Sequence, residues 1–146
     1  MGHIAMTIDT LAAFLVANLN PFIAARSTVA VPLTAITADQ VATREYQLPA
    51  KKVGIFLDPQ PETVEPLTMT TVDVRLPVEI IVFTQGDTIA LMRAKGEAYM
   101  GAVRDCIATH EDYFELELRD RFDGVEGKED IKAVKIVAVF RYEEAR

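Results

Sequence analysis

The chain has 146 residues, half of them hydrophobic and a quarter charged, which is typical of a globular domain and not of a disordered segment. The formal net charge of −7 excludes a general affinity for nucleic acid, because phosphate binding requires a concentrated positive surface. No apolar run approaches the roughly 18–20 residues of a membrane span, and the single cysteine, Cys106, cannot form an internal disulfide. We therefore expect one soluble domain over residues 7–146, with residues 1–6 interpreted as a tag remnant or a disordered leader.

The first predicted element is an amphipathic helix over residues 7–19. Its apolar stripe consists of Ile8, Leu11, Ala12, Leu15, Val16 and Leu19. Asn18, Asn20 and Pro21 predict the end of this helix. Phe14 lies off the stripe, which predicts a second apolar contact with another element or with another subunit.

Residues 21–49 predict an edge strand followed by a long loop. Residues 28–37 are rich in β-branched side chains, but Pro32 restricts such a strand to the edge of a sheet. Residues 38–42 are compatible with a helical turn, and residues 44–48 with a short strand.

A strand over residues 53–57 should precede an exposed, extended loop over residues 58–66. This loop contains three prolines and three acidic residues. The spacing of the acidic residues does not match a calcium-binding EF-hand loop. Long loops are often functional or interfacial, so Asp58, Glu62 and Glu65 are candidate subunit or partner contacts.

Residues 71–84 form the longest predicted strand, because their hydrophobicity alternates with a period of two. The apolar face consists of Val72, Val74, Leu76, Val78, Ile80 and Val82. The opposite face carries Asp73, Arg75 and Glu79. Ile81 and Phe83 then make the second face apolar, which predicts that this end is covered on both sides. A straight strand would span about 45 Å, and Pro77 interrupts it, so we expect a bend, an edge position or a bulge, or a projecting β-ribbon.

A long amphipathic helix should follow Gly86, with Asp87 as its N-terminal cap. Its sheet-facing stripe consists of Ile89, Met92, Gly96, Tyr99, Val103 and Ile107. Glycine inside a helix costs about 1 kcal/mol relative to alanine, so close approach of the backbone is one explanation for both helix glycines. We expect Gly96 to approach a strand and Gly101 to approach a neighbouring chain, which makes Gly101 an interface candidate. The alternative is that both glycines are merely tolerated.

Two final strands are predicted over residues 113–122 and 131–142. In the first, Phe114, Leu116 and Leu118 are expected to point inward. The connecting turn contributes further interface candidates, namely Gly124, Glu126 and Lys128. The whole pattern predicts an α+β fold, with one mostly antiparallel or mixed sheet, an N-terminal helix and a long helix packed on the sheet.

Few residues offer chemistry. Cys106 and His110 are four positions apart and could share a helix face as metal ligands or as nucleophile and base. Cys106 lies on or beside the buried stripe, however, so we predict a core thiol and no metal, cofactor or catalytic site. Glu97 as the acid of a hot-dog-type thioesterase is the enzymatic alternative.

The order of elements resembles that of the tail terminator proteins of long-tailed bacteriophages and prophages. The matching parts are the first helix, the strand that ends in Asp58-Pro59, and the strand over residues 78–83 with Gly86-Asp87 and its helix. The strands over residues 113–122 and 131–142 match the closing pair. The resemblance covers most of the chain but includes no diagnostic motif, so no functional residue is carried over.

The resemblance implies a structural, non-enzymatic virion protein. It would form a ring, typically of six subunits, that caps the tail tube and presents a surface to the head connector. It would assemble in the bacterial host cytoplasm, reside in the virion tail, and bind neither a specific nucleic acid nor a membrane. A ring of this kind needs two different complementary patches on each subunit, to which Phe14 and the long loops could contribute. A head–tail connector component and a small-ligand or thioester enzyme of hot-dog-like fold are the alternatives.

Overall fold

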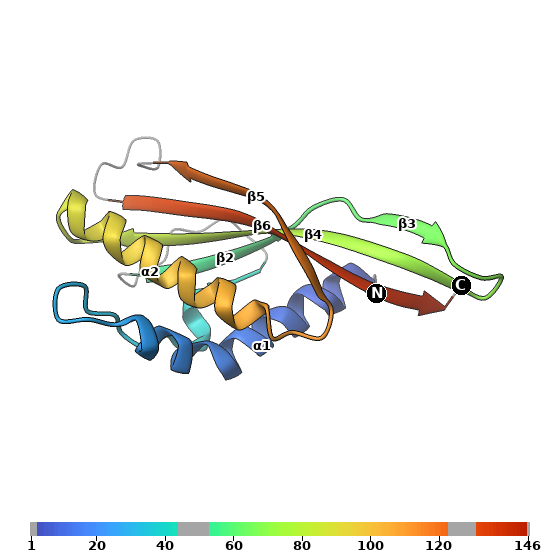
Figure 1. Cartoon of the computed structure of the whole chain (residues 1–146), viewed down its shortest axis with the longest axis horizontal. Coiled ribbons are helices and arrows are strands. Elements are labelled where there is room, and N and C mark those ends of the chain that lie inside the picture. Colours follow the sequence, from blue (N-terminus) through green and yellow to red (C-terminus); the bar gives the residue numbers. More distant parts are fainter. Residues whose placement is uncertain (1–2, 44–52, 123–130, 146) are drawn as a thin grey trace.

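A computed structural model, which describes residues 3–43, 53–122 and 131–145, shows an α+β fold with both helices on one face of a six-stranded sheet (Figure 1). The elements are α1 (His3–Arg26), η1 (Ala38–Gln40), β1 (Val41–Ala42), β2 (Val53–Pro59), β3 (Thr63–Pro66), β4 (Thr71–Gln85), α2 (Ile89–Ile107), β5 (Tyr113–Phe122) and β6 (Ile131–Ala145). The strand order is β1-β2-β4-β6-β5, and β3 also pairs with β4. Within the part of the chain that the structure describes, β1–β2 is the only parallel pair, so the predicted mostly antiparallel sheet is confirmed.

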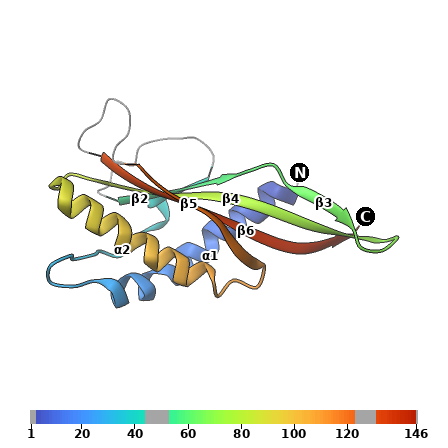
Figure 2. The same ribbon diagram turned by 45° about the horizontal axis from the view of Figure 1, so that its top comes forward.

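The sheet is organised by the pairing of β4 with β6. These two 15-residue strands stay in one continuous register from Thr71 opposite Ala145 to Gln85 opposite Ile131. At the helix-covered end, β2 and β5 flank the pair. At the other end, β4 and β6 run on past the helices with β3 alongside, as both views show (Figure 2). This three-stranded projection, residues 63–76 and 141–145, is called the ribbon below. The projecting ribbon predicted from the length of the strand is thus present.

Pro77 causes neither a bulge nor a break in the β4–β6 pairing. It lies where β4 changes partner, because β2 pairs only as far as Val78 and β3 begins opposite Arg75. The carbonyl of Pro77 faces that gap and accepts a hydrogen bond from the Gln60 amide (2.9 Å). Its nitrogen therefore also points away from β6, and the missing N–H removes no bond from the long pair.

The main core lies between the sheet and the two helices. The even-numbered apolar residues of β4 from Val74 to Val82 are fully buried on this face, as are Ile136, Ala138 and Phe140 of β6. A second, smaller apolar cluster occupies the opposite face at the end of β4. It contains Phe56, Ile81, Phe83, Ile131 and Ala133, all less than 10% exposed. The prediction that this end of β4 is buried on both sides is confirmed.

Helix α1 is longer than predicted, because it continues through Pro21 to Arg26. An internal proline typically costs a helix about 3 kcal/mol. The extra turn offsets part of this cost by burying Ile23, which is 1% exposed, and half-burying Phe22. Asn18 donates to the carbonyl of Phe14 and does not end the helix. Asn20 is not a stop signal either, because its side chain holds the loop after the helix.

Residues 8–26 of α1 are long and apolar enough to cross a membrane by length and composition alone, which corrects the expectation that no segment approaches this length. The apolar character of α1 is explained by its packing against the core of the protein. The large apolar side chains of the helix face the core, with Ile8, Leu11, Leu15 and Leu19 at most 3% exposed. The residues exposed on the outer face are mainly alanines and polar side chains.

The predicted edge strand over residues 28–37 is wrong. These residues form an irregular loop that returns along the helices, followed by η1 and the two-residue strand β1. Asn20 pairs with both backbone groups of Ile36, donating to its carbonyl (3.1 Å) and accepting from its amide (2.9 Å). These side-chain bonds satisfy backbone groups that a strand would have paired with a neighbour. The short strand predicted over residues 44–48 lies outside the described residues.

Residues 58–66 are only partly the extended loop that was predicted. β2 continues to Pro59, and Thr63–Pro66 form strand β3, in register with residues 72–75 of β4. The prolines are compatible with this because Pro59 ends β2 and Pro66 ends an edge strand, positions at which a missing N–H is tolerated. The predicted exposure holds for β3, whose four residues are all exposed.

Helix α2 follows the predicted stripe, with one correction at its start. Met92, Gly96, Tyr99, Val103 and Ile107 are buried, but Ile89 is 53% exposed. Thr88 caps the helix by accepting from the Leu91 amide, because Asp87 is instead held by Lys95 (2.9 Å). A Cβ added at Gly96 would lie 3.3 Å from Val134, so this glycine does approach the sheet.

Gly101 approaches α1 of the same chain. A Cβ placed on it would lie 2.6 Å from Cζ of Arg26, whose guanidinium crosses α2 to reach Asp105 (2.7 Å). The glycine thus makes room for an ion pair between the two helices. Both partners are more than a third exposed, so this pair adds little stability.

We predict that Gly101→Ala raises the stability of an Arg26→Ala variant by about 1 kcal/mol, because alanine is the better helix former once the guanidinium is removed. In the wild-type background the same substitution displaces Arg26, and the gain should be smaller. Urea denaturation of the four proteins of this double-mutant cycle measures the difference. Equal effects in both backgrounds would contradict the proposed role of the glycine.

Candidate functional site: two docking surfaces

A β-bulge in β5, at the base of the ribbon, determines the direction in which Phe114 points. Tyr113 pairs with Phe140 and Glu115 with Val139, so Phe114 is an extra residue with no partner on β6. Tyr113 faces the core and packs edge-on against Phe140. The bulge turns Phe114 outward, where it is 44% exposed. The prediction that Phe114 points inward is therefore wrong, because strict alternation fails at an inserted residue.

Phe114 lies against two arginines that face each other across the long strand pair. Arg75 and Arg141 are direct register partners, and their guanidinium carbons lie 5.0 and 5.3 Å from the Phe114 ring centre. Like charges opposite one another would repel. The charge of Arg141 is neutralised by Asp73, whose two carboxylate oxygens each accept from Nε of Arg141 at 3.0 Å. The charge of Arg75 is neutralised by Glu115, whose carboxylate accepts from the Arg75 guanidinium at 3.0 Å. We call these five residues the neck cluster.

The neck cluster links the ribbon to the body of the protein. Asp73 is 5% exposed, and its hydrogen bond and charge raise the pKa of Arg141 above its ordinary value. The contacts join β4 and β6 of the ribbon to β5 of the body. This arrangement restrains the direction in which the ribbon projects.

The far end of the ribbon is apolar and exposed. Val64 on β3 is 50% exposed, and Leu67 and Met69 in the β3–β4 turn are 47% and 90% exposed. We call these three residues the ribbon tip. The turn is closed by Thr68, whose hydroxyl accepts from the Thr71 amide (3.0 Å) and lies 2.7 Å from the Thr71 hydroxyl. The apolar side chains of the tip are therefore presented on an ordered turn.

Exposed apolar residues also lie at the opposite end of the long axis, both in the loop that follows α1 and at the start of α2 (Figure 1). Val29 in this loop is fully exposed, and Ile89 in the first turn of α2 is 53% exposed. We call residues 27–37 together with Ile89 the platform. No charged side chain occurs in residues 27–37.

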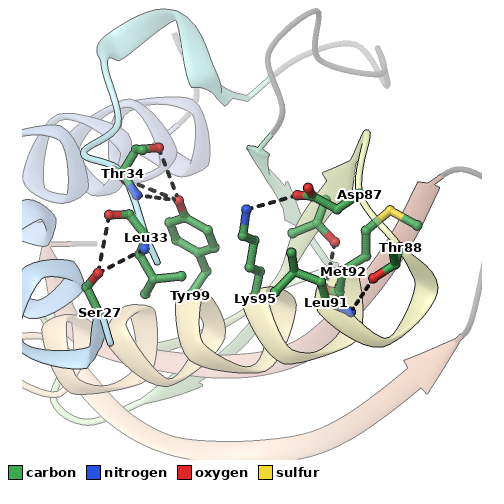
Figure 3. Close-up of polar contacts among 10 residues, drawn as sticks. Ser27, Leu33, Thr34, Asp87, Thr88, Leu91, Met92, Lys95 and Tyr99 are labelled. Atoms are coloured by element: carbon green, nitrogen blue, oxygen red, sulfur yellow. Dashed lines mark hydrogen bonds and ion pairs between the residues drawn. The ribbon is translucent and has the colours of Figure 1, made fainter. Parts of the chain in front are cut away.

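The platform loop is held by polar contacts within itself and with Tyr99 of α2 (Figure 3). Ser27 accepts from the Leu33 amide (2.9 Å), and the Thr28 hydroxyl accepts from the Val31 amide (2.9 Å). The Tyr99 hydroxyl accepts from the Thr34 amide (2.9 Å) and lies 3.2 Å from the Thr34 carbonyl. The loop thus presents Val29 in a defined position.

The predicted interface residues do not form one site. Phe14 is half-buried and packs edge-on against His110 at 4.8 Å, so it has a contact within its own chain. Asp58 and Glu62 lie in or beside the gap between β2 and β3, and Glu65 lies on the exposed strand β3. Gly101 is buried beneath Arg26. Gly124, Glu126 and Lys128 lie outside the described residues.

Val64 of the ribbon tip lies in the loop over residues 58–66 that was predicted as an interface, but Leu67, Met69 and the platform were not among the predicted sites. A sequence signal exists for the tip, since Leu67 and Met69 alternate with threonines in a turn, where apolar residues are unusual. The sequence signal for the platform is that residues 27–37 carry no charged side chain. Their β-branched residues, however, predicted an edge strand and not an exposed loop. Only the fold shows that these two stretches lie at opposite ends of the molecule.

Cys106 and His110, two of the residues considered for chemistry, lie in structural positions. Cys106 is fully buried, and desolvation raises the pKa of its thiol to about 11. Nδ1 of His110 accepts from the Asp112 amide, and the ring packs between Phe14 and Phe140. Glu97 is exposed on α2. Among the residues that the structure describes, no group of three or more His, Cys, Asp or Glu side chains could hold a metal ion.

Comparison with known proteins gives no family. No family model matches the chain, and no curated protein matches its sequence. A solved structure described as "Virion of native gene transfer agent (GTA) particle" contains a similar chain, with 16% identity, a TM-score of 0.45, and coverage of 89% of this chain and 95% of that one. At this level of similarity, no role is transferred from that structure.

We predict that Asp73→Ala lowers the free energy of unfolding by about 1–3 kcal/mol, because it removes a buried carboxylate and leaves Arg75 opposite Arg141. Glu115→Ala is the matched control, since it removes an exposed partner from the same cluster and should cost at most about 1 kcal/mol. Chemical denaturation measures both values. Hydrogen exchange should show loss of protection in the ribbon for Asp73→Ala. Equal effects of the two substitutions would contradict the role assigned to Asp73.

We predict that Cys106 reacts with thiol reagents at pH 8 only when the protein opens, because the buried thiol stays protonated. Since the folded pKa exceeds the unfolded one, burial of the thiol stabilises the protein fully below the unfolded pKa of about 8.5. That contribution is lost as the pH rises towards 11. Labelling followed with and without denaturant, and denaturation at pH 8 and 10, are the measurements. Rapid labelling of the native protein would contradict the assignment.

Proposed function

We propose that this protein is a structural component of a phage-like virion, with no enzymatic activity, that assembles head to tail into a ring. In the finer form of the proposal, the ring has six subunits, caps the tail tube and presents a surface to the head connector. It would assemble in the bacterial host cytoplasm and become part of the virion tail. The resemblance in element order to tail terminator proteins suggests this function, and the surfaces of the chain support it.

The observation that carries the proposal is the presence of two different exposed apolar surfaces at opposite ends of one elongated chain. Five of the six large hydrophobic residues exposed in the described parts belong to these surfaces: Val64, Leu67 and Met69 at one end, and Val29 and Ile89 at the other. A head-to-tail interface requires two unlike patches on each subunit, whereas a two-fold dimer requires only one self-complementary patch. The presence of two unlike apolar surfaces on one chain is therefore suited to head-to-tail assembly into a ring or a filament.

The size of the chain is compatible with such contacts. A stable interface buries about 800 Å² on each partner. Two contacts of this size would cover about a fifth of the 8189 Å² surface. Both surfaces are also ordered by their own hydrogen bonds, which lowers the entropy that association would cost.

We predict that the solution mass rises with concentration to a closed oligomer, with six subunits as the expected number. Light scattering across a wide concentration range measures the mass, and electron microscopy of the largest species tests for a ring. A compact two-fold dimer as the end state would contradict the proposal. A monomer at all concentrations would contradict it as well.

A further inference from the structure

We propose that the subunit contact of the ring is formed by the ribbon tip of one copy against the platform of the next. This inference rests on the proposed function, and it states which surfaces bind each other. The partner of each surface is thus a second copy of this chain.

The exposed apolar side chains support this pairing. The sixth exposed large hydrophobic residue of the described parts, Phe114, already lies against Arg75 and Arg141. Met69 at the tip, which is 90% exposed, and Val29 on the platform, which is fully exposed, are the most exposed of these six residues. Burying a methionine or valine side chain is favourable because it removes apolar surface from water. A contact that covers both ends removes most of this exposed apolar surface at once.

The charges disfavour the competing contact of one ribbon with another. The ribbon carries acidic residues on both of its edges: Glu65 on β3, and Glu143 and Glu144 on β6. Its two basic residues, Arg75 and Arg141, already lie against Glu115 and Asp73. Two ribbons side by side would therefore place like charges together. Residues 27–37 carry no charge, so the platform accepts an acidic ribbon without such repulsion.

The ribbon edges disfavour docking by strand addition. β3 is only four residues long, carries Glu65 and ends in Pro66. The segment of β6 beyond Phe140 is rich in charged residues. Short, charged and proline-containing edges are the features that prevent strands from pairing between molecules. The contact should therefore be made by the side chains of the tip, and not by backbone pairing along an edge.

The test is a complementation experiment with two variants, Met69→Asp and Val29→Asp. Each places a charge on one of the two surfaces and leaves the other intact, so each variant alone should lose self-association by at least about tenfold. An equimolar mixture retains one intact contact, between the tip of the Val29→Asp chain and the platform of the Met69→Asp chain. The mixture should therefore form a one-to-one heterodimer but no ring, as measured by light scattering.

Ala13→Asp, an exposed position in the middle of α1, is the matched control and should assemble like the wild type. Circular dichroism checks that each variant is folded, which is expected because both substituted residues are on the surface. Normal assembly of either variant would overturn the assignment of its surface. Loss of assembly in both variants without recovery in the mixture would show that the two surfaces do not meet.

The same experiment separates this inference from the proposed function. If the wild type forms a ring and either variant does so too, the ring stands and the tip–platform contact is wrong. If the wild type stays monomeric at all concentrations, the ring itself is contradicted, and with it the contact.

Discussion

The structure depends on the uninterrupted pairing of β4 with β6. Fifteen residues of each strand pair in one register, and this single ladder supports two different environments. In the body, helices α1 and α2 cover one face of the ladder, and apolar side chains from both strands fill the core. In the ribbon, the same ladder carries only β3 beside it. The ribbon is therefore an extension of the core sheet and not an appended loop, so its position relative to the body is set by backbone hydrogen bonds.

The two ends of the molecule obtain their order in different ways. The ribbon is held by the ladder, by the neck cluster around Phe114, and by the threonine contacts of its turn. The platform has no strand pairing over residues 27–37 and depends on side chains, above all Asn20 and Tyr99, that bond to its backbone. Both ends are nevertheless ordered surfaces with exposed apolar residues, which is the property that the proposed head-to-tail assembly requires.

The sequence predicted those elements whose side-chain period is set by local structure. The alternation over residues 71–84 and the stripe from Met92 to Ile107 identified β4 and α2, because each element has one face against the core. Errors occurred where a distant residue decided the outcome. α1 passes through Pro21 because Ile23 is buried by other elements, and residues 28–37 are a loop because Asn20 pairs with Ile36. Phe114 faces outward because of a bulge that exists only relative to β6.

The two candidate surfaces also depend on contacts between distant parts of the chain. Val29 and Met69 lie about 40 residues apart in sequence, and their placement at opposite ends of the molecule is a property of the fold.

The position of Pro77 has a consequence for the fidelity of folding. Alternate residues of a strand direct their N–H groups to opposite sides, so a one-residue slip of β4 against β6 would turn the nitrogen of Pro77 towards β6. The slipped ladder would then lack a hydrogen bond near its middle, and the buried and exposed faces of β4 would also be exchanged. The proline that interrupts the pattern of a long strand thus penalises the most accessible misaligned pairing, and it does so at the boundary where the ribbon leaves the body.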